Sequence, residues 1–206
     1  MAALVLVQSE IAEASWTFEF FGGSVYNVPA PLSIEQSGYK DLKINAHYET
    51  RPFLSPQYYC VRAAKWKANT AWEIEFIHHK LFLKNKPSEV QFFSITHGYN
   101  MFTANRAWNI KGIIIHTGAG VVIPHPETTV RNRAYSEKKG ILNRGYYISG
   151  TVVQIALGKN LSIRNKLFFI VEGKATGSYT HIPIKNGDAY VENVAFHGVF
   201  GLGYRF

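Results

Sequence analysis

The sequence predicts an all-β fold, namely an eight-stranded antiparallel up-and-down β-barrel that crosses a membrane with its strands. Three observations predict it. Eight long segments alternate between apolar residues and small or polar ones, the period of a strand with two different faces. Every second connection between them is short, as in membrane barrels. The chain has 14 Phe, 12 Tyr and 4 Trp, yet no apolar run approaches the ~20 residues of a membrane helix.

Residues 1–14, MAALVLVQSEIAEA, precede the first expected strand. They begin apolar and close on Ala12, Glu13 and Ala14, a small-x-small pattern that comes before signal-peptidase cuts. We interpret residues 1–14 as a signal peptide whose beginning is missing, and residues 15–206 as the outer-membrane barrel. A plain N-terminal extension is the alternative.

The eight expected strands follow in order. They are SWTFEFFGGSVYN (15–27), QYYCVRAAKW (57–66), AWEIEFIHHKLFL (71–83), VQFFSITHGYNMFTA (90–104), WNIKGIIIHTGAGVVI (108–123), GYYISGTVVQIALG (145–158), LSIRNKLFFIVEGKATG (161–177) and AYVENVAFHGVFGLGYRF (189–206). A ninth alternating stretch, DLKINAHYE (41–49), falls in the long first connection, where we expect it to form a strand extension within the loop.

The connections alternate in length. Those at 67–70, 105–107 and 159–160 are short, and those at 28–56, 84–89, 123–144 and 178–189 are longer. Because the strand number is even, both termini lie at one end of the barrel, which we expect to be the periplasmic end. All the longer loops then face outward from the outer membrane of a Gram-negative bacterium.

The alternation also assigns the two faces of the wall. In the strand at 167–176, Leu167, Phe169 and Val171 face lipid, and the residues between them face a narrow lumen. The charged residues assigned to the lumen in this way are Arg62, Glu73, Glu75, Glu172, Lys174 and Arg205. Because an unpaired charge there costs several kcal/mol, we expect these residues to pair with one another and to close the barrel.

Aromatic residues are expected to gather at both ends of the strands, as the two girdles of a membrane barrel. The periplasmic girdle comprises Trp66, Trp72, Trp108, Tyr204 and Phe206, and the outer girdle comprises Tyr58, Tyr59, Tyr146 and Tyr147. The last strand ends on Phe206 without a polar tail. This ending looks like the C-terminal signal by which the barrel-assembly machinery recognises a client.

The motifs of several other protein classes are missing from the sequence. The single Cys60 cannot form an intramolecular disulfide, and there is no Cys/His zinc spacing. Ser and His have no spacing typical of a nucleophile and its base, and no glycine-rich phosphate loop occurs. The net charge of +8 comes largely from the expected outer loops, so we expect lipopolysaccharide phosphates as partners and no nucleic acid.

The stretch VVIPHPETTVRNR, where a strand enters the long 123–144 loop, is the richest candidate site. His125 and Glu127 are two residues apart, and the prolines at 124 and 126 stiffen the backbone around them. A histidine and a carboxylate held in this way can share a divalent metal or a proton. A rigid loop stem with a solvated histidine is the alternative. For His97, on ITHGYN, we favour a structural role as a girdle histidine beside a lumen hydrogen-bonding row over a functional one.

The set of segments as a whole resembles the outer-membrane β-barrel family that includes the rhizobial-type lipid A oxidases, and more broadly barrels like OmpW and OmpA. The most specific piece is G-x-G-V-x-x-P-H-x-E, from Gly118 to Glu127. The resemblance implies an enzyme that uses molecular oxygen to oxidise the proximal glucosamine of lipid A to aminogluconate at the outer leaflet. The sequence departs from the family at Pro126 and His97.

Combining the resemblance with the loop positions gives a set of site residues. We expect His125 and Glu127 to be the catalytic or metal-binding pair. The residues expected to bind the phosphates and sugars of lipid A are Arg131, Arg133, Tyr146, Tyr147, Tyr58 and Arg51. Two alternatives are a structural or lipopolysaccharide-binding barrel and a barrel that passes an apolar ligand. A lipid A deacylase or palmitoyltransferase fits less well, because no Ser and His are recognisably placed at the rim.

Overall fold

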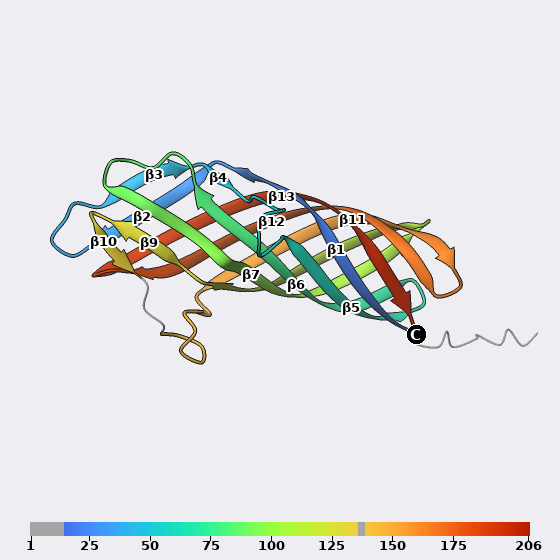
Figure 1. Ribbon diagram of the computed structural model, residues 1–206. Coiled ribbons are helices and arrows are strands. Elements are labelled where there is room, and N and C mark those ends of the chain that lie inside the picture. The colour runs from blue at the N-terminus through green and yellow to red at the C-terminus, as the bar shows by residue number, and fades with distance from the viewer. Residues whose placement is uncertain (1–14, 136–138) are drawn as a thin grey trace, which may run out of the picture.

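The computed structural model describes residues 15–135 and 139–206, and its main feature is a closed ring of eight antiparallel strands (Figure 1). The ring strands are β1 (Ser15–Val28), β5 (Tyr59–Lys67), β6 (Thr70–Leu83), β7 (Val90–Ile110), β8 (Ile113–Pro124), β11 (Gly150–Arg164), β12 (Leu167–Ile184) and β13 (Gly187–Arg205). Each pairs with its neighbours, and β1 closes the ring by pairing with both β5 and β13. The predicted fold class is confirmed. The expected signal peptide, residues 1–14, lies outside the described residues.

Two of the three short turns lie elsewhere than predicted. The turn at 67–70 is confirmed, but the turns expected at 105–107 and 159–160 lie at residues 111–112 and 165–166. Lys111 and Asn165 adopt left-handed backbone angles there, with φ of 52° and 40°. The turn at 105–107 was wrong because these residues continue β7, where the Asn105 side chain is buried in the lumen and donates to Glu75.

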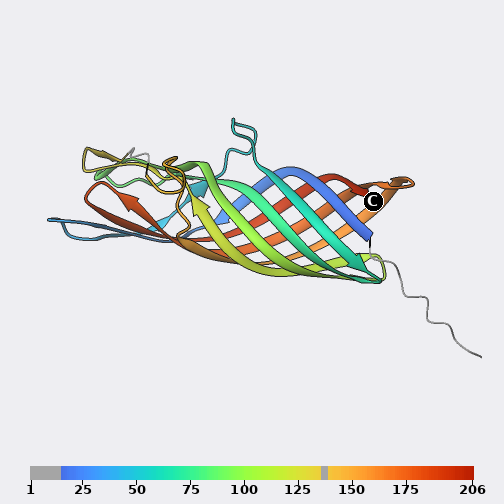
Figure 2. The same cartoon turned by 90° about the horizontal axis from the view of Figure 1, so that it is seen from below.

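Short strands extend the wall at the end with the long connections, which we call the loop end; the opposite end is the turn end. They are β2 (Ala30–Gln36), β3 (Leu42–Ala46), β4 (Tyr48–Glu49), β9 (Glu127–Val130) and β10 (Arg133–Tyr135). The stretch 41–49 thus forms loop strands, as predicted. Figures 1 and 2 show these strands at the end opposite the C-terminus. Their inner faces bury an apolar core that includes Leu32, Ile34, Leu81, Phe93 and Val130, so this core seals the loop end.

The wall is apolar on its outside along the ring strands. Phe18, Phe20 and Ile74 are about half exposed, as are Val153, Ile155 and Leu157 on β11 and Phe200 and Leu202 on β13. An exposed apolar belt of this extent on a closed barrel is suited to lipid. The described part of the chain contains no helix long and apolar enough to span a membrane.

Two of the predicted girdle residues point inward. Tyr58 is 3% exposed, and its hydroxyl lies 2.9 Å from Nδ1 of His197 inside the barrel. Trp66 is partly buried and packs against an inner cluster that contains Ala64, Ala71 and Ile114. The strand alternation accounts for both positions, since Tyr58 and Trp66 are even-numbered and lie in phase with the inward-facing Arg62.

Candidate functional site

The lumen holds a dense network of buried charges centred on Arg62. Its guanidinium donates to Glu172 at 2.7 Å, Glu19 at 3.1 Å and Glu75 at 3.3 Å, and its Nε lies 3.8 Å from Glu73. Lys174 pairs with Glu75 and lies 3.4 Å from Glu172. Glu19 was not among the predicted lumen charges, although it lies in phase with the inward-facing Thr17 and Phe21 of β1.

Two further residues correct the predicted lumen network. Arg205 does not take part in it: its side chain is exposed at the turn end, with the guanidinium carbon 5.9 Å from the Phe168 ring centre. His116, which was not among the predicted residues, joins the network. Its Nδ1 lies 2.9 Å from Glu73 and its Nε2 lies 3.3 Å from Glu172. The described members of the network, without Arg205, are all buried, so the network closes the lumen.

A second cluster of polar side chains lies on the outside of the wall, where β8 passes into β9. Ile123, His125 and Glu127 follow one another with the same alternation, and Val122, Pro124 and Pro126 between them point inward. His125 and Glu127 therefore continue the lipid-facing row of β8 beyond its apolar end. Pro126 removes a backbone donor, so the ladder with β7 is interrupted here and resumes at Glu127.

A bulge in β7 brings a third side chain to the same place. Tyr99 pairs with Pro124 and Ser94 pairs with Glu127, so β7 uses four residues, 95–98, where the facing chain uses two. Gly98 absorbs the bend with φ of 133°, and its carbonyl accepts from the His125 backbone N–H at 2.9 Å. The bulge turns the His97 side chain toward Glu127, and His97 Nδ1 lies 2.5 Å from Glu127 Oε1.

His97, His125 and Glu127 form a cluster that is suited to a metal ion. One ligand atom from each lies within 4.8 Å of the other two, and the two imidazole ring centres are 4.9 Å apart. His97 is exposed, His125 and Glu127 are half-buried, and Nδ1 of His125 is buried without a hydrogen-bond partner. Burial lowers the pKa of His125, and the neighbouring His97 lowers that pKa further. His125 is therefore held as the neutral imidazole that binds metals.

The donor set indicates which chemistry the cluster can support. Two histidines and one carboxylate that leave open positions are the ligands of non-haem iron(II) oxygenases. His125 and Glu127 were predicted as the pair, whereas the interpretation of His97 as purely structural did not anticipate its place beside them. The glycine that follows His97 inside an otherwise regular strand was the available signal, since such a glycine often marks a bulge.

Two of the other predicted site residues border this cluster. The Tyr146 ring meets the His125 ring edge-on with centres 4.8 Å apart, and its hydroxyl donates to the His97 carbonyl at 3.0 Å. The Tyr147 hydroxyl lies 2.6 Å from that of Tyr135. Both tyrosines belong to the 139–149 connection, which runs beside the cluster.

The remaining predicted residues lie apart from it. Arg131 and Arg133 stack on Tyr39, with guanidinium carbons 4.5 and 5.3 Å from the ring centre. Arg131 also donates to Gln36 and to the Lys40 carbonyl, so its guanidinium ties two loop-end hairpins together. Arg51 pairs with Glu49 and lies over Phe82. Tyr58 is inside the barrel, so its assignment to the rim is wrong.

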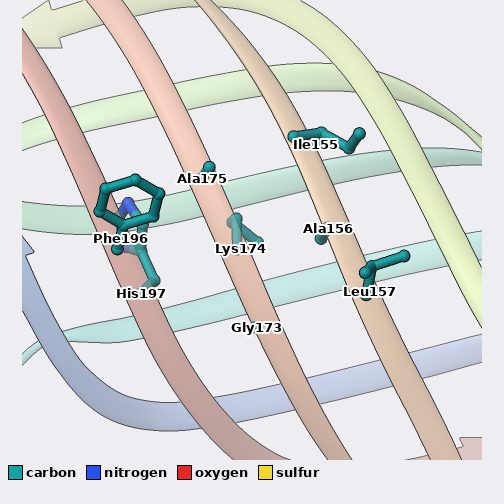
Figure 3. Close-up of a pocket in the computed structure, with 8 residues that line it drawn as sticks. All are labelled: Ile155, Ala156, Leu157, Gly173, Lys174, Ala175, Phe196 and His197. Carbon is teal, nitrogen blue, oxygen red and sulfur yellow. The ribbon is translucent and has the colours of Figure 1, made fainter.

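A hollow of about 400 Å³ lies on the outside of β11, β12 and β13, apart from the cluster (Figure 3). It forms because Gly173 and Ala175 lie between the larger Ile155, Leu157 and Phe196. Lys174 and His197 border it from behind, since their side chains are buried toward the lumen. Its surface is apolar, so it belongs to the lipid-facing belt and carries no chemistry of its own.

The structure of this chain is similar to solved structures of other proteins over nearly their whole length. The attachment invasion locus protein Ail of Yersinia pestis is 12% identical, with a TM-score of 0.40, over 95% of this chain and 99% of Ail. Neisserial surface protein A is 7% identical, with a TM-score of 0.45, over 94% of this chain and 97% of that protein. No family model matches the chain, and no curated protein matches it.

Proposed function

We propose that this protein is an outer-membrane enzyme that binds a divalent metal at His97, His125 and Glu127 and oxidises lipid A with molecular oxygen. The observation that carries the proposal is the placement of two imidazoles and one carboxylate together on the outside of the wall. Lipid A is the amphiphile of the outer leaflet, so its sugars would meet this cluster from the side.

The architecture supports an outer-membrane location. The barrel has an apolar belt and a sealed lumen, and its first and last ring strands, β1 and β13, are paired along their length. Barrels of this form cross the outer membrane with short periplasmic turns and long external loops. The loop end, which carries the cluster, would therefore face outward with both termini in the periplasm.

The proposed reaction is a two-electron oxidation of the proximal glucosamine at its anomeric carbon. A free hemiacetal loses the hydrogens of its C1–H and O–H bonds with two electrons, and dioxygen takes them up as hydrogen peroxide. Water then opens the resulting lactone to the aminogluconate. A metal bound by the cluster would supply the site for oxygen reduction. His97 and Glu127, whose side chains share a hydrogen-bonding contact, are placed to hold and move the proton.

Two alternatives fit the structure less well. A channel for an apolar ligand needs an open apolar lumen, whereas this lumen is filled by the ion pairs of Arg62 and Lys174. A barrel that only binds lipopolysaccharide would account for the basic loops but not for the convergence of three ligand side chains through a bulge and a proline break.

Lipid A mass spectrometry tests the proposed activity. Cells that carry the gene are expected to contain lipid A heavier by one oxygen atom at the proximal sugar, because the hemiacetal becomes an acid. Removal of oxygen, or treatment of the purified protein with a chelator, should abolish the product. Identical lipid A spectra with and without the gene would reject the oxidase assignment.

Metal binding can be measured independently of catalysis. Purified protein in detergent is expected to bind one divalent metal, for example Co(II) followed by its absorption spectrum. His97→Ala should weaken this binding by at least about tenfold, since losing even an outer partner of a metal ligand costs 10–100-fold. His181→Ala is a matched control, because His181 is also exposed and paired with a carboxylate, that of Asp188, but lies outside the cluster. Equal affinities of the two variants would contradict the metal assignment.

A further inference from the structure

The loop beside the cluster carries an apolar tip. Residues 140–146 fold into a tight hairpin in which the Ile141 backbone N–H donates to the Tyr146 carbonyl at 2.7 Å. Arg144 N–H donates back to the Ile141 carbonyl at 3.1 Å and closes the turn. Leu142 is at its apex and is 82% exposed. Ile148, on the returning arm, is 64% exposed.

Packing within the described chain gives no reason for a leucine at this apex. Leu142 has φ of 52°, a left-handed conformation that costs a residue with a β-carbon about 1 kcal/mol and that Asn or Gly adopts more readily. The neighbouring Asn143, with φ of 54°, is the residue type such turns prefer. An exposed apolar side chain held in an unfavourable conformation points to a contact outside the chain.

The position of the loop indicates what that contact is. Figure 1 shows the 139–148 segment hanging at the side of the barrel and not across its open end. Tyr147 N–H donates to the Pro124 carbonyl and Ser149 N–H to the Val122 carbonyl, so the returning arm continues the pairing of β11 with β8. The returning arm therefore joins the wall at the loop end of β11, whose lipid-facing row includes Val153 and Ile155.

The same loop is fixed against the cluster. A β-carbon added to Gly145 would lie 2.9 Å from Nε2 of His125, so the backbone of the loop closely approaches that imidazole. Tyr146 packs on the same ring and donates to the His97 carbonyl. Any surface that holds Ile141, Leu142 and Ile148 therefore also sets the height of the cluster relative to the lipid.

We propose that residues 139–148 form a membrane-docking loop whose apolar tip enters the outer leaflet and holds the His97–His125–Glu127 cluster at the level of the lipid headgroups. The occupant of this surface is bilayer lipid. Its apolar tip projects at the side of the barrel, whose wall carries the lipid-facing belt, and the exposed Arg144 beside the tip is suited to lipid phosphate (Figure 1). Substrate then reaches the cluster sideways from the leaflet and not through the lumen. This last step rests on the proposed function, whereas the docking itself does not.

Spin-label depth measurements test the docking without reference to activity. In a Cys60→Ala background, labels are placed at Leu142→Cys, at Val153→Cys on the lipid-facing wall and at Asp41→Cys near the loop-end hairpin of β2 and β3. The protein is reconstituted in bilayers of lipopolysaccharide and phospholipid. The Leu142 label is expected to be more accessible to oxygen than to a water-soluble nickel complex, as at Val153. Accessibility like that at Asp41 overturns the proposal.

One variant tests whether docking of the loop is needed for oxidation of lipid A at the cluster. Leu142→Asn removes the apolar tip and suits the left-handed backbone, so the fold should be retained. We expect its oxidation of lipid A in bilayers to fall about tenfold, the loss expected from exposing one leucine, with Co(II) affinity unchanged. Unchanged bilayer activity overturns the lateral route. If the wild type oxidises no lipid A while its Leu142 label is buried in lipid, the proposed function fails and the docking stands.

Discussion

Replacing Arg62 by methionine is expected to lower the free energy of unfolding by about 4 kcal/mol or more, because breaking a buried ion pair by removing one partner typically costs 3–5 kcal/mol. Arg62 is 1% exposed and contacts Glu19, Glu73, Glu75 and Glu172. Without it, four carboxylates share the lumen with Lys174 and His116. Methionine keeps an unbranched apolar stem and removes the guanidinium, so the loss reports mainly on the charge and its hydrogen bonds.

The loss of stability in Arg62→Met is measured by urea unfolding of the reconstituted barrel, and two further variants show whether it comes from the ion pairs. Arg205→Met removes an exposed arginine whose guanidinium lies over the ring of Phe168, and it should change the stability by less than about 0.5 kcal/mol, as is usual for surface substitutions. Arg62→Met combined with Glu172→Gln should recover part of the loss, since the carboxylate nearest to the guanidinium is then uncharged. If Arg62→Met were as stable as Arg205→Met, the network would not be what holds the wall together.

The sequence predicted those parts of the fold that depend on alternation. Every residue of a barrel strand faces either lipid or lumen, so the pattern that placed Glu172 and Lys174 inward and Val171 outward needed no knowledge of the neighbouring strands. The same pattern located eight strands. It did not place every strand end, since Asn105, expected in a turn, lies within β7 with its side chain in the lumen, where Glu75 and Gln154 are its partners.

At the candidate site, prediction from the sequence was limited by long-range strand pairing. His125 and Glu127 are neighbours along the chain, so their local spacing could suggest a shared ligand. His97 lies 28 positions before His125, and it joins them only because β7 carries two extra residues opposite the proline break. A bulge depends on the register between two strands, and the register is set by the whole ring. Sequence reasoning that treated each strand by itself could not place His97 beside Glu127.

His125→Ala is expected to reduce the rate of lipid A oxidation by about 100-fold or more, because even outer partners of metal ligands contribute 10–100-fold. His125 is the most enclosed histidine of the cluster, between the His97 ring, the Tyr146 ring and the backbone of Gly145. It is also the histidine whose pKa is lowered by burial, so it is held ready as a neutral ligand.

The measurement is the yield of aminogluconate lipid A per folded barrel, by mass spectrometry of purified protein with its substrate. His181→Ala, which removes an exposed histidine on β12, should keep the wild-type rate. Glu127→Gln should fall with His125→Ala, since the amide retains the shape but neither the charge nor the proton acceptor opposite His97. If His125→Ala and Glu127→Gln oxidised lipid A as fast as His181→Ala, then the cluster would be a rigid stem of the loop and the catalytic site would have to lie elsewhere on the rim.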